Sequence, residues 1–323
     1  MKKRLIALML SCVLCLSGLA TTAYAIPAGG TSQMLEKAKD SVVFLWVVGY
    51  DVSGRVQATG SGSGFAVGKA GKDSDVFLTN WHVVTLDGNF PTERTKVWIL
   101  KENCAILSNY EPDPSNSIEC RVMKTTSGYP DYAVIKMQKY EPGYKALPLL
   151  PAEKAAKGTD VYALGFPGVV EASSVERFGG VNLTATNGMI SRFAQLSWAG
   201  NTNIIFHTAT ISFGNSGGPL VTKDGAVIGI NTYGIGEHNI DYSCAIYIDY
   251  AMEGLDELGI AYTVYSKTWM IVAGVAAGVA VIAAVVVIVI LRKKKAEEEE
   301  RKRQKKIKAD LEIQKEKERI AKE

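Results

Sequence analysis

The amino-acid sequence predicts an all-β domain followed by one transmembrane helix and a charged helical tail. Two observations support this: short apolar or alternating runs recur between Gly, Asn, Asp and Pro residues, and a long uncharged segment lies near the C-terminal end. Closely spaced runs of this kind are typical of a β-barrel or a β-sandwich. The expected strands lie at residues 42–50, 63–67, 76–84, 96–100, 118–124, 132–138, 160–165, 181–185, 189–195, 203–208, 219–222 and 226–233.

The uncharged segment, Trp269–Leu291, is long enough to cross a membrane. As a helix, its 23 residues would extend roughly 35 Å, whereas the hydrocarbon core is about 30 Å thick. Four basic residues follow at once, so the positive-inside rule places the C-terminus in the cytoplasm and the β domain outside. Gly274 and Gly278 match a spacing that favours helix self-association, although a helix without such contacts fits equally well.

The tail after residue 291 contains fourteen Lys or Arg and nine Asp or Glu, a net charge of +5. Acidic residues at 297–299 stand four positions before basic residues at 301–303, which favours a helix. We expect this helix to lie solvated along anionic lipid, and a docking arm for a cytosolic partner is the alternative. Because basic and acidic residues are mixed along this tail, nucleic-acid binding is not expected.

The N-terminal end has the three parts of a secretory signal. Lys2, Lys3 and Arg4 precede an apolar stretch that runs to about Leu19, and cleavage is expected after Ala25. The style of this signal indicates a bacterium.

The motif Gly214–Pro219 combines a serine with three glycines. Without a Cβ, Gly217 and Gly218 can adopt positive φ and leave room beside Ser216 for a bound backbone. The amides of Gly214 and Ser216 could then form an oxyanion hole. Taken alone, the motif fits a glycine-rich hairpin equally well.

A serine nucleophile needs an imidazole to accept its proton and a carboxylate to orient that imidazole. The chain has three histidines. His82 is expected at the mouth of the predicted strand 76–84, facing a cleft. We expect His207, inside a strand, to be a core or wall histidine with its hydrogen bonds satisfied, and His238 to be a solvated loop residue.

Asp131 is the best-placed carboxylate, because it follows a turn and opens the strand 132–137. A turn-capping role is its alternative. His82, Asp131 and Ser216 occur in the order found in chymotrypsin.

The strings around these residues resemble the HtrA/DegP branch of the trypsin-like serine proteases. They are TNWHVV at 79–84, DYAVIKM at 131–137 and GNSGGPLV at 214–221, with further likeness at 60–65 and 245–249. The resemblance covers about residues 35 to 262. It implies two six-stranded antiparallel β-barrels with the active site between them.

The resemblance also implies roles: Ser216 as nucleophile, His82 as general base then acid, and Asp131 as the residue that orients His82. The resulting domain boundaries are 1–25 signal peptide, 26–40 lead segment, 41–262 protease domain with barrels at about 41–140 and 155–262, 263–268 linker, 269–291 transmembrane helix and 292–323 cytoplasmic tail.

Within the family resemblance, Asn215 bears on activation, and four residues outside the motif bear on specificity. Asn215 replaces the acid that pairs with a new N-terminus in digestive relatives, so activity should not require propeptide removal. The floor of the S1 pocket falls on Thr210, and its wall on Asn231, Thr232 and Tyr233. Without an acid, this pocket should not favour Lys or Arg.

Departures from the HtrA pattern matter as well. The interval before Trp269 is too short for a PDZ domain, so PDZ-based regulation does not transfer and the oligomeric state stays open. No spacing indicates a metal site, and no cofactor is expected. Cys104 and Cys120 flank a polar insertion, and a disulfide between them is one of two open alternatives; Cys244 would then be a buried thiol.

We therefore expect a membrane-anchored extracytoplasmic serine endopeptidase of the cell membrane that acts on exported polypeptides. The alternative is a protease-fold sensor that binds peptides, turns over slowly and signals through the tail.

Overall fold

The computed structural model describes residues 30–168, 183–237 and 240–320. The predicted signal peptide, His238 and part of the expected strand at 181–185 lie outside these residues. The two barrels belong to one compact unit that ends at Tyr265, and the C-terminal helix belongs to a second unit.

The first barrel is a closed antiparallel sheet with strand order β1-β2-β3-β6-β5-β4. Its strands are β1 (Val42–Tyr50), β2 (Val56–Ala66), β3 (Val76–Thr79), β4 (Thr95–Leu100), β5 (Ser117–Thr125) and β6 (Ala133–Met137), with the short helices α3 (Trp81–Thr85) and η2 (Thr92–Arg94) between them.

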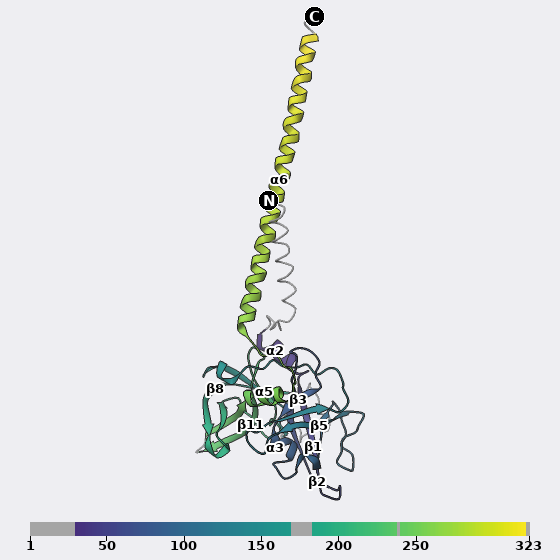
Figure 1. Ribbon diagram of the computed structural model, residues 1–323, viewed down its shortest axis with the longest axis vertical. Coiled ribbons are helices and arrows are strands. Elements are labelled where there is room, and N and C mark those ends of the chain that lie inside the picture. Colours follow the sequence, from purple (N-terminus) through teal and green to yellow (C-terminus); the bar gives the residue numbers. More distant parts are fainter. Residues whose placement is uncertain (1–29, 169–182, 238–239, 321–323) are drawn as a thin grey trace. The chain divides into compact units, whose positions relative to one another are not determined.

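The second barrel is also closed and antiparallel, with strand order β10-β11-β12-β9-β8-β7. Its strands are β7 (Asp160–Gly165), β8 (Thr184–Leu196), β9 (Thr202–His207), β10 (Pro219–Thr222), β11 (Val227–Glu237) and β12 (Ile240–Tyr247), with the turn η5 (Ser197–Ala199) between β8 and β9. The predicted pair of six-stranded barrels is therefore confirmed (Figure 1).

The continuous apolar run of β1 follows from burial on both of its faces. Val43, Leu45 and Val47 belong to one buried cluster together with residues of β4, β5 and β6. Phe44 belongs to a different cluster that includes residues of both barrels, and its ring meets Phe166, just after β7, edge to face at 5.8 Å. A strand that is buried on both faces loses the polar alternation of a half-exposed strand.

The segment between the barrels pairs with both of them. Leu147 bridges to Val67 beside β2, and Leu149 bridges to Val227 of β11; the turn η3 (Ala152–Lys154) follows. Helix α5 (Ile248–Glu257) packs against β6 of the first barrel and against β11 and β12 of the second. Helix α2 (Gly30–Ala38) contributes Met34 and Ala38 to the shared cluster.

Several predicted strand limits need correction. The run 76–84 ends as a strand at Thr79, and residues 81–85 form a helix, so His82 lies on α3 and not on a strand. β2 begins seven residues earlier than expected because its Gly and Ser residues pair along β1. The last two residues of the run 181–185 and the run 189–195 belong to one strand, β8, and β12 was not predicted as a strand.

The second unit contains helix α6 (Lys267–Ile320). Among the described residues it contains one stretch, Gly274–Ile313, that is long and apolar enough to cross a membrane, and the apolar part of this stretch is not buried against the rest of the chain. The predicted apolar segment and the charged tail thus form one continuous helix (Figure 1).

The disulfide between Cys104 and Cys120 is absent. Cys104, Cys120 and Cys244 are free and buried. Cys120 packs inside the first barrel with Ile118 and Met137, whereas Cys104 packs in the cluster that both barrels share. Cys104 and Cys120 flank the same insertion in the sequence, but their side chains pack in different clusters and therefore do not meet.

His207 is a fully buried residue at the end of β9. The prediction of a core histidine is correct, but neither ring nitrogen has a hydrogen-bond partner among the described residues. Burial lowers the pKa of His207 to about 4, and the backbone of Ala209 offsets only part of this effect. The imidazole is therefore held neutral in the folded state.

This burial predicts acid sensitivity. An unfolded histidine titrates near pH 6.5, so the unfolded state gains a proton first and stability falls as the pH drops from 6.5 towards 4. The wild-type free energy of unfolding should decrease by about 2 kcal/mol more between pH 7.5 and 5 than that of His207→Gln. Urea titrations followed by tryptophan fluorescence measure this difference, and equal pH dependence of the two proteins would contradict it.

Candidate active site

Strand pairing brings His82 and Asp131 together, although 49 positions separate them. β3 and β6 are antiparallel neighbours with Thr79 opposite Ala133. The residues that follow β3 therefore lie beside those that precede β6. Asn80 strengthens this junction because its side-chain amide donates a hydrogen bond to the backbone carbonyl of Asp131 (2.6 Å).

Asp131 binds His82 at two points. Its Oδ1 accepts a hydrogen bond from the backbone amide of His82 (3.0 Å), and its Oδ2 lies 2.7 Å from the ring Nδ1. The carboxylate is buried, whereas the His82 side chain is one-quarter exposed. With Nδ1 held by the carboxylate, Nε2 is the ring nitrogen left to exchange a proton with another group.

The pKa of His82 is raised above its ordinary value of 6.5. Burial lowers this pKa, but the hydrogen bond to Asp131 and the charges of Asp131 and Asp87 together outweigh the effect of burial. Asp131 thus favours the protonated imidazole, which is the state that a general base reaches after it accepts a proton.

The loop that carries Ser216 is attached to the first barrel through Ser63 of β2. The amide of Ser63 donates to the carbonyl of Ser216 (2.8 Å), and its hydroxyl donates to the carbonyl of Gly214 (2.7 Å). The same hydroxyl accepts a hydrogen bond from the amide of Phe166 (3.0 Å). The sequence assigned Ser63 no role in the site, although residues 60–65 contribute to the family resemblance.

Thr232 connects the serine to the aspartate. The hydroxyl of Ser216 donates to the backbone carbonyl of Thr232 (2.9 Å), and the hydroxyl of Thr232 donates to Oδ2 of Asp131 (2.5 Å). Among the described residues, Ser216 and His82 share no hydrogen bond. The structure therefore brings the three predicted catalytic residues into one hydrogen-bonded group through a residue that was predicted only as a pocket wall.

Within the described residues, neither of the two amides predicted for the oxyanion hole donates to a backbone carbonyl. The neighbouring amides of Asn215, Gly217 and Gly218 donate to backbone carbonyls, but within the described residues those of Gly214 and Ser216 do not. The carbonyl of Phe213 accepts a hydrogen bond from Gly168 (2.6 Å). Since that peptide is trans, its N–H on Gly214 points the opposite way. An oxyanion hole needs two such donors aimed at one point, so the assignment of these amides stays a prediction.

The four residues predicted for the substrate pocket differ in exposure. Thr210 is exposed, and its carbonyl accepts a hydrogen bond from Thr186 (2.6 Å). Asn231 and Thr232 are buried, and Asn231 donates to the carbonyl of Pro219 (3.2 Å). Tyr233 is partly buried. As a substrate pocket, this set stays a prediction.

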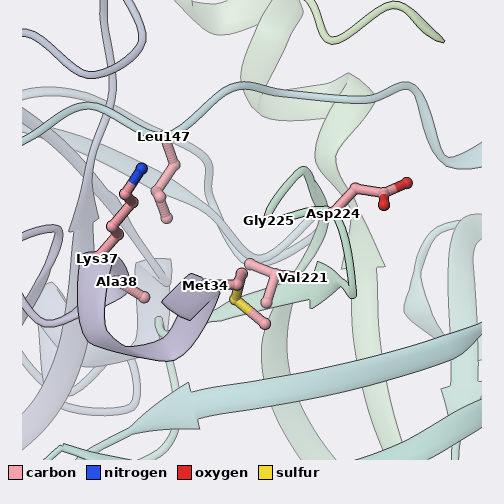
Figure 2. A pocket seen from close by; sticks show the side chains of 7 residues that line it. All are labelled: Met34, Lys37, Ala38, Leu147, Val221, Asp224 and Gly225. Atoms are coloured by element: carbon pink, nitrogen blue, oxygen red, sulfur yellow. The ribbon is translucent and has the colours of Figure 1, made fainter. Parts of the chain in front are cut away.

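A small pocket elsewhere in the β domain contains none of these residues (Figure 2). It lies between α2, the segment between the barrels and the turn after β10. Its lining residues are Met34, Lys37, Ala38, Leu147, Val221, Asp224 and Gly225. The part of the chain that the structure describes also contains no cluster of three or more His, Cys, Asp or Glu suited to a metal ion.

Comparison with known proteins points to one family. A model of the family described as trypsin-like peptidase domain matches residues 62–230, just over half of the chain. The bovine (Bos taurus) mitochondrial serine protease HTRA2 is 31% identical over 210 residues, which make up 62% of this chain and 38% of HTRA2. Human HTRA3 is 29% identical over 210 residues, which make up 62% of this chain and 39% of that protein.

The chain is also similar to a protein that is not named as a protease and to a solved structure. The anti-sigma-I factor RsgI9 of Acetivibrio thermocellus is 30% identical over 234 residues, 72% of this chain and 27% of that protein. The solved HtrA-type protease AlgW, in a structure with a tripeptide, aligns with a TM-score of 0.51 and 22% identity over 71% of this chain and 64% of that one. The chain spans between about a quarter and two fifths of the length of the curated relatives named here.

The loop geometry predicts that Gly217 cannot be replaced. Its φ is +85°, and an added Cβ would lie 2.1 Å from the carbonyl oxygen of Ser63 and 2.2 Å from Oγ1 of Thr79. Gly217→Ala should therefore lower the free energy of unfolding by at least about 2 kcal/mol, through backbone strain and overpacking together.

Gly54→Ala is the matched control for this substitution. Gly54 has a similar φ of +81°, but no atom lies within 4 Å of an added Cβ. Gly54→Ala should therefore lower the free energy of unfolding by only about 1 kcal/mol, through backbone strain alone. Urea denaturation compares the two variants, and equal losses would show that the contact with the first barrel does not constrain the loop.

Proposed function

This chain belongs to the trypsin-like peptidase family, and within it we propose a membrane-anchored serine endopeptidase that cleaves exported polypeptides outside the cytoplasm. The observation that carries the proposal is the hydrogen-bonded group of His82, Asp131, Thr232 and Ser216. Similarity to the HTRA proteases supports the same activity.

The proposed reaction starts when the oxygen of Ser216 attacks the carbonyl carbon of a peptide bond. His82 accepts the serine proton at Nε2, and the amides of Gly214 and Ser216 stabilise the negative oxygen of the tetrahedral intermediate. The C–N bond then breaks as His82 returns the proton to the leaving amine. Water hydrolyses the acyl-enzyme by the same steps, and Asp131 keeps the imidazole oriented throughout.

Thr232 gives substrate binding a direct effect on the nucleophile. In the structure, the Ser216 hydroxyl donates to the Thr232 carbonyl and must turn away from it to donate to His82. A backbone N–H of a bound peptide can take over that carbonyl as its donor. The serine hydroxyl would then be free to reach Nε2, so binding and alignment of the nucleophile would occur together.

The pocket residues support a preference for uncharged side chains next to the scissile bond. Thr210, Asn231, Thr232 and Tyr233 carry no negative charge. A lysine or arginine buried against them would lose its hydration without gaining an ion pair. Small or aliphatic side chains are therefore the expected substrates at this position.

Helix α6 supports the proposed location. Its apolar part can cross a membrane, and the basic residues Arg292–Lys295 that follow favour the cytoplasmic side. With the chain in this orientation, the β domain would act on polypeptides at the outer face of the membrane. The tail would lie against anionic lipid on the inner face.

A second candidate function is a slow protease-fold sensor that signals across the membrane. The observation that favours it is the similarity to an anti-sigma-I factor over 72% of this chain. In this alternative, Ser216 would keep its hydrogen bond to Thr232 when a peptide binds, and the charged tail would carry the signal.

A fluorophosphonate probe separates the two functions because it reacts only with an activated serine. Full-length protein should label at Ser216, and Ser216→Ala should not label. His82→Ala should label roughly 10²- to 10⁴-fold more slowly, since the general base is lost. Ser212→Ala, which alters an exposed serine on the same loop, should label at the wild-type rate. A folded wild-type protein that does not label would exclude the protease and leave the sensor.

The rate of labelling should depend on pH in a direction set by Asp131. Only neutral His82 accepts the serine proton, so the rate should fall as the pH drops through the His82 pKa, which lies above 6.5. In Asp131→Asn, the contributions of Asp131 that raise this pKa disappear and burial still lowers it. The acid midpoint should therefore move below pH 6.5 while the maximal rate decreases. An unchanged midpoint would contradict the assigned role of Asp131.

A further inference from the structure

Ser63 of β2 bridges two backbone groups that belong to different segments of the second barrel. Its hydroxyl donates a hydrogen bond to the carbonyl of Gly214 (2.7 Å) and accepts one from the amide of Phe166 (3.0 Å). An amide can only donate and a carbonyl can only accept, so the hydroxyl proton must lie towards Gly214. Ser63 is fully buried, and bulk solvent therefore cannot replace the hydroxyl if it is removed.

The peptide between Phe213 and Gly214 is held on both sides. The carbonyl of Phe213 accepts a hydrogen bond from the amide of Gly168 (2.6 Å), and the carbonyl of Gly214 accepts the Ser63 hydroxyl. Gly168 lies two residues after Phe166, whose amide Ser63 also binds. Three hydrogen bonds therefore close a ring in which Ser63 is the member that belongs to the first barrel.

This ring fixes the direction of the Gly214 amide, which is one of the two donors predicted for the oxyanion hole. In a trans peptide the N–H points away from the preceding C=O, so the contact between Phe213 and Gly168 turns the Gly214 N–H to the other side. Gly214 has a φ of +98°, and an added Cβ would lie 2.2 Å from the carbonyl oxygen of Phe166. The loop thus packs against the residues after β7 without space for a side chain.

The end of β7 leaves room for the Ser63 hydroxyl. A Cβ added to Gly165 would lie 2.8 Å from Oγ of Ser63 and 2.9 Å from Oδ1 of Asn215. At such distances one of the groups has to move. A side chain at position 165 would therefore displace the hydroxyl of Ser63, the residue before the nucleophile, or both.

We propose that Ser63 is a positioning residue for the oxyanion hole, whose hydroxyl aims the amides of Gly214 and Ser216 at the substrate oxygen without touching the substrate. The inference rests on the proposed protease function. The amide of Ser63 also donates to the carbonyl of Ser216 (2.8 Å), so the nucleophile and the Gly214 peptide share one support. Such donors act on a transition state only when they are preorganised, and a misplacement of about 1 Å can lower a rate by about 10²-fold.

Fluorophosphonate labelling of the full-length protein in detergent tests this role. The phosphoryl oxygen of the probe takes the place of the oxyanion when the probe reacts, so the natural substrate need not be known. Ser63→Ala should label roughly 10- to 100-fold more slowly than wild type. Among the described residues Ser63 makes no hydrogen bond to His82 or Asp131, so the acid midpoint of the rate should stay at its wild-type value.

Ser74→Ala is the matched control, because Ser74 makes the same kind of bridge away from the site. Its hydroxyl donates to the carbonyl of Val67 (2.6 Å) and accepts from the amide of Val76 (3.1 Å), and Ser74 is also buried. Both variants lose one buried bridge, so both should unfold at a lower urea concentration than wild type. Only Ser63→Ala should lose labelling rate.

Ser63→Cys provides a second variant that keeps a weaker donor at the same position. It should label at a rate between those of Ser63→Ala and wild type. If Ser63→Ala does not fold, as judged by circular dichroism, Ser63→Cys takes its place in the comparison, and Ser74→Cys becomes the control.

Slow labelling after substitution of Ser63, with an unchanged acid midpoint and normal labelling of the Ser74 variant, supports the inference. A wild-type rate in the folded Ser63 variant overturns it, and so does an equal loss of rate in the two variants. A shifted acid midpoint also overturns it, because Ser63 would then act through His82. Failure of the folded wild-type protein to label overturns the proposed function itself.

Discussion

The buried carboxylate of Asp131 is the interaction on which the site depends. It accepts hydrogen bonds from the backbone and the ring of His82 in the first barrel and from the hydroxyl of Thr232 in the second. A carboxylate removed from water is stable only when such donors surround it. Because the donors come from both barrels, the barrels must meet at this point, and the candidate active site lies where they do.

The nucleophile loop obeys a second constraint of the same kind. Ser63 of the first barrel holds the carbonyls of Gly214 and Ser216 from the second barrel. The loop can approach so closely only because Gly217 has no Cβ at the point of contact. The position and the composition of the loop thus have one cause, which is its close contact with Ser63 and Thr79 of the first barrel.

Exposed aromatic side chains also meet where the two barrels face each other. Tyr129 and Trp198 come from different barrels, and each is exposed while stacked on its neighbour. These two rings therefore form a further contact between the barrels, and Tyr129 precedes Asp131 by two residues.

The sequence by itself determined the features that depend on local pattern. The apolar runs predicted β1, β7 and most other strands, the uncharged run predicted the apolar helix, and the motif around Ser216 indicated the nucleophile loop together with His82 and Asp131. The local pattern gave the wrong secondary structure for His82, because its apolar neighbours suit a strand or a helix equally. His82 lies on α3.

Only the tertiary structure decided what depends on register and on facing surfaces. Thr232 donates a hydrogen bond to Asp131, and the loop with Ser216 is bound to Ser63. Cys104 and Cys120 pack in different clusters. Tyr129 and Trp198, far apart in the chain, are in contact. No sequence spacing encodes these contacts, because they arise when two closed barrels pack against each other.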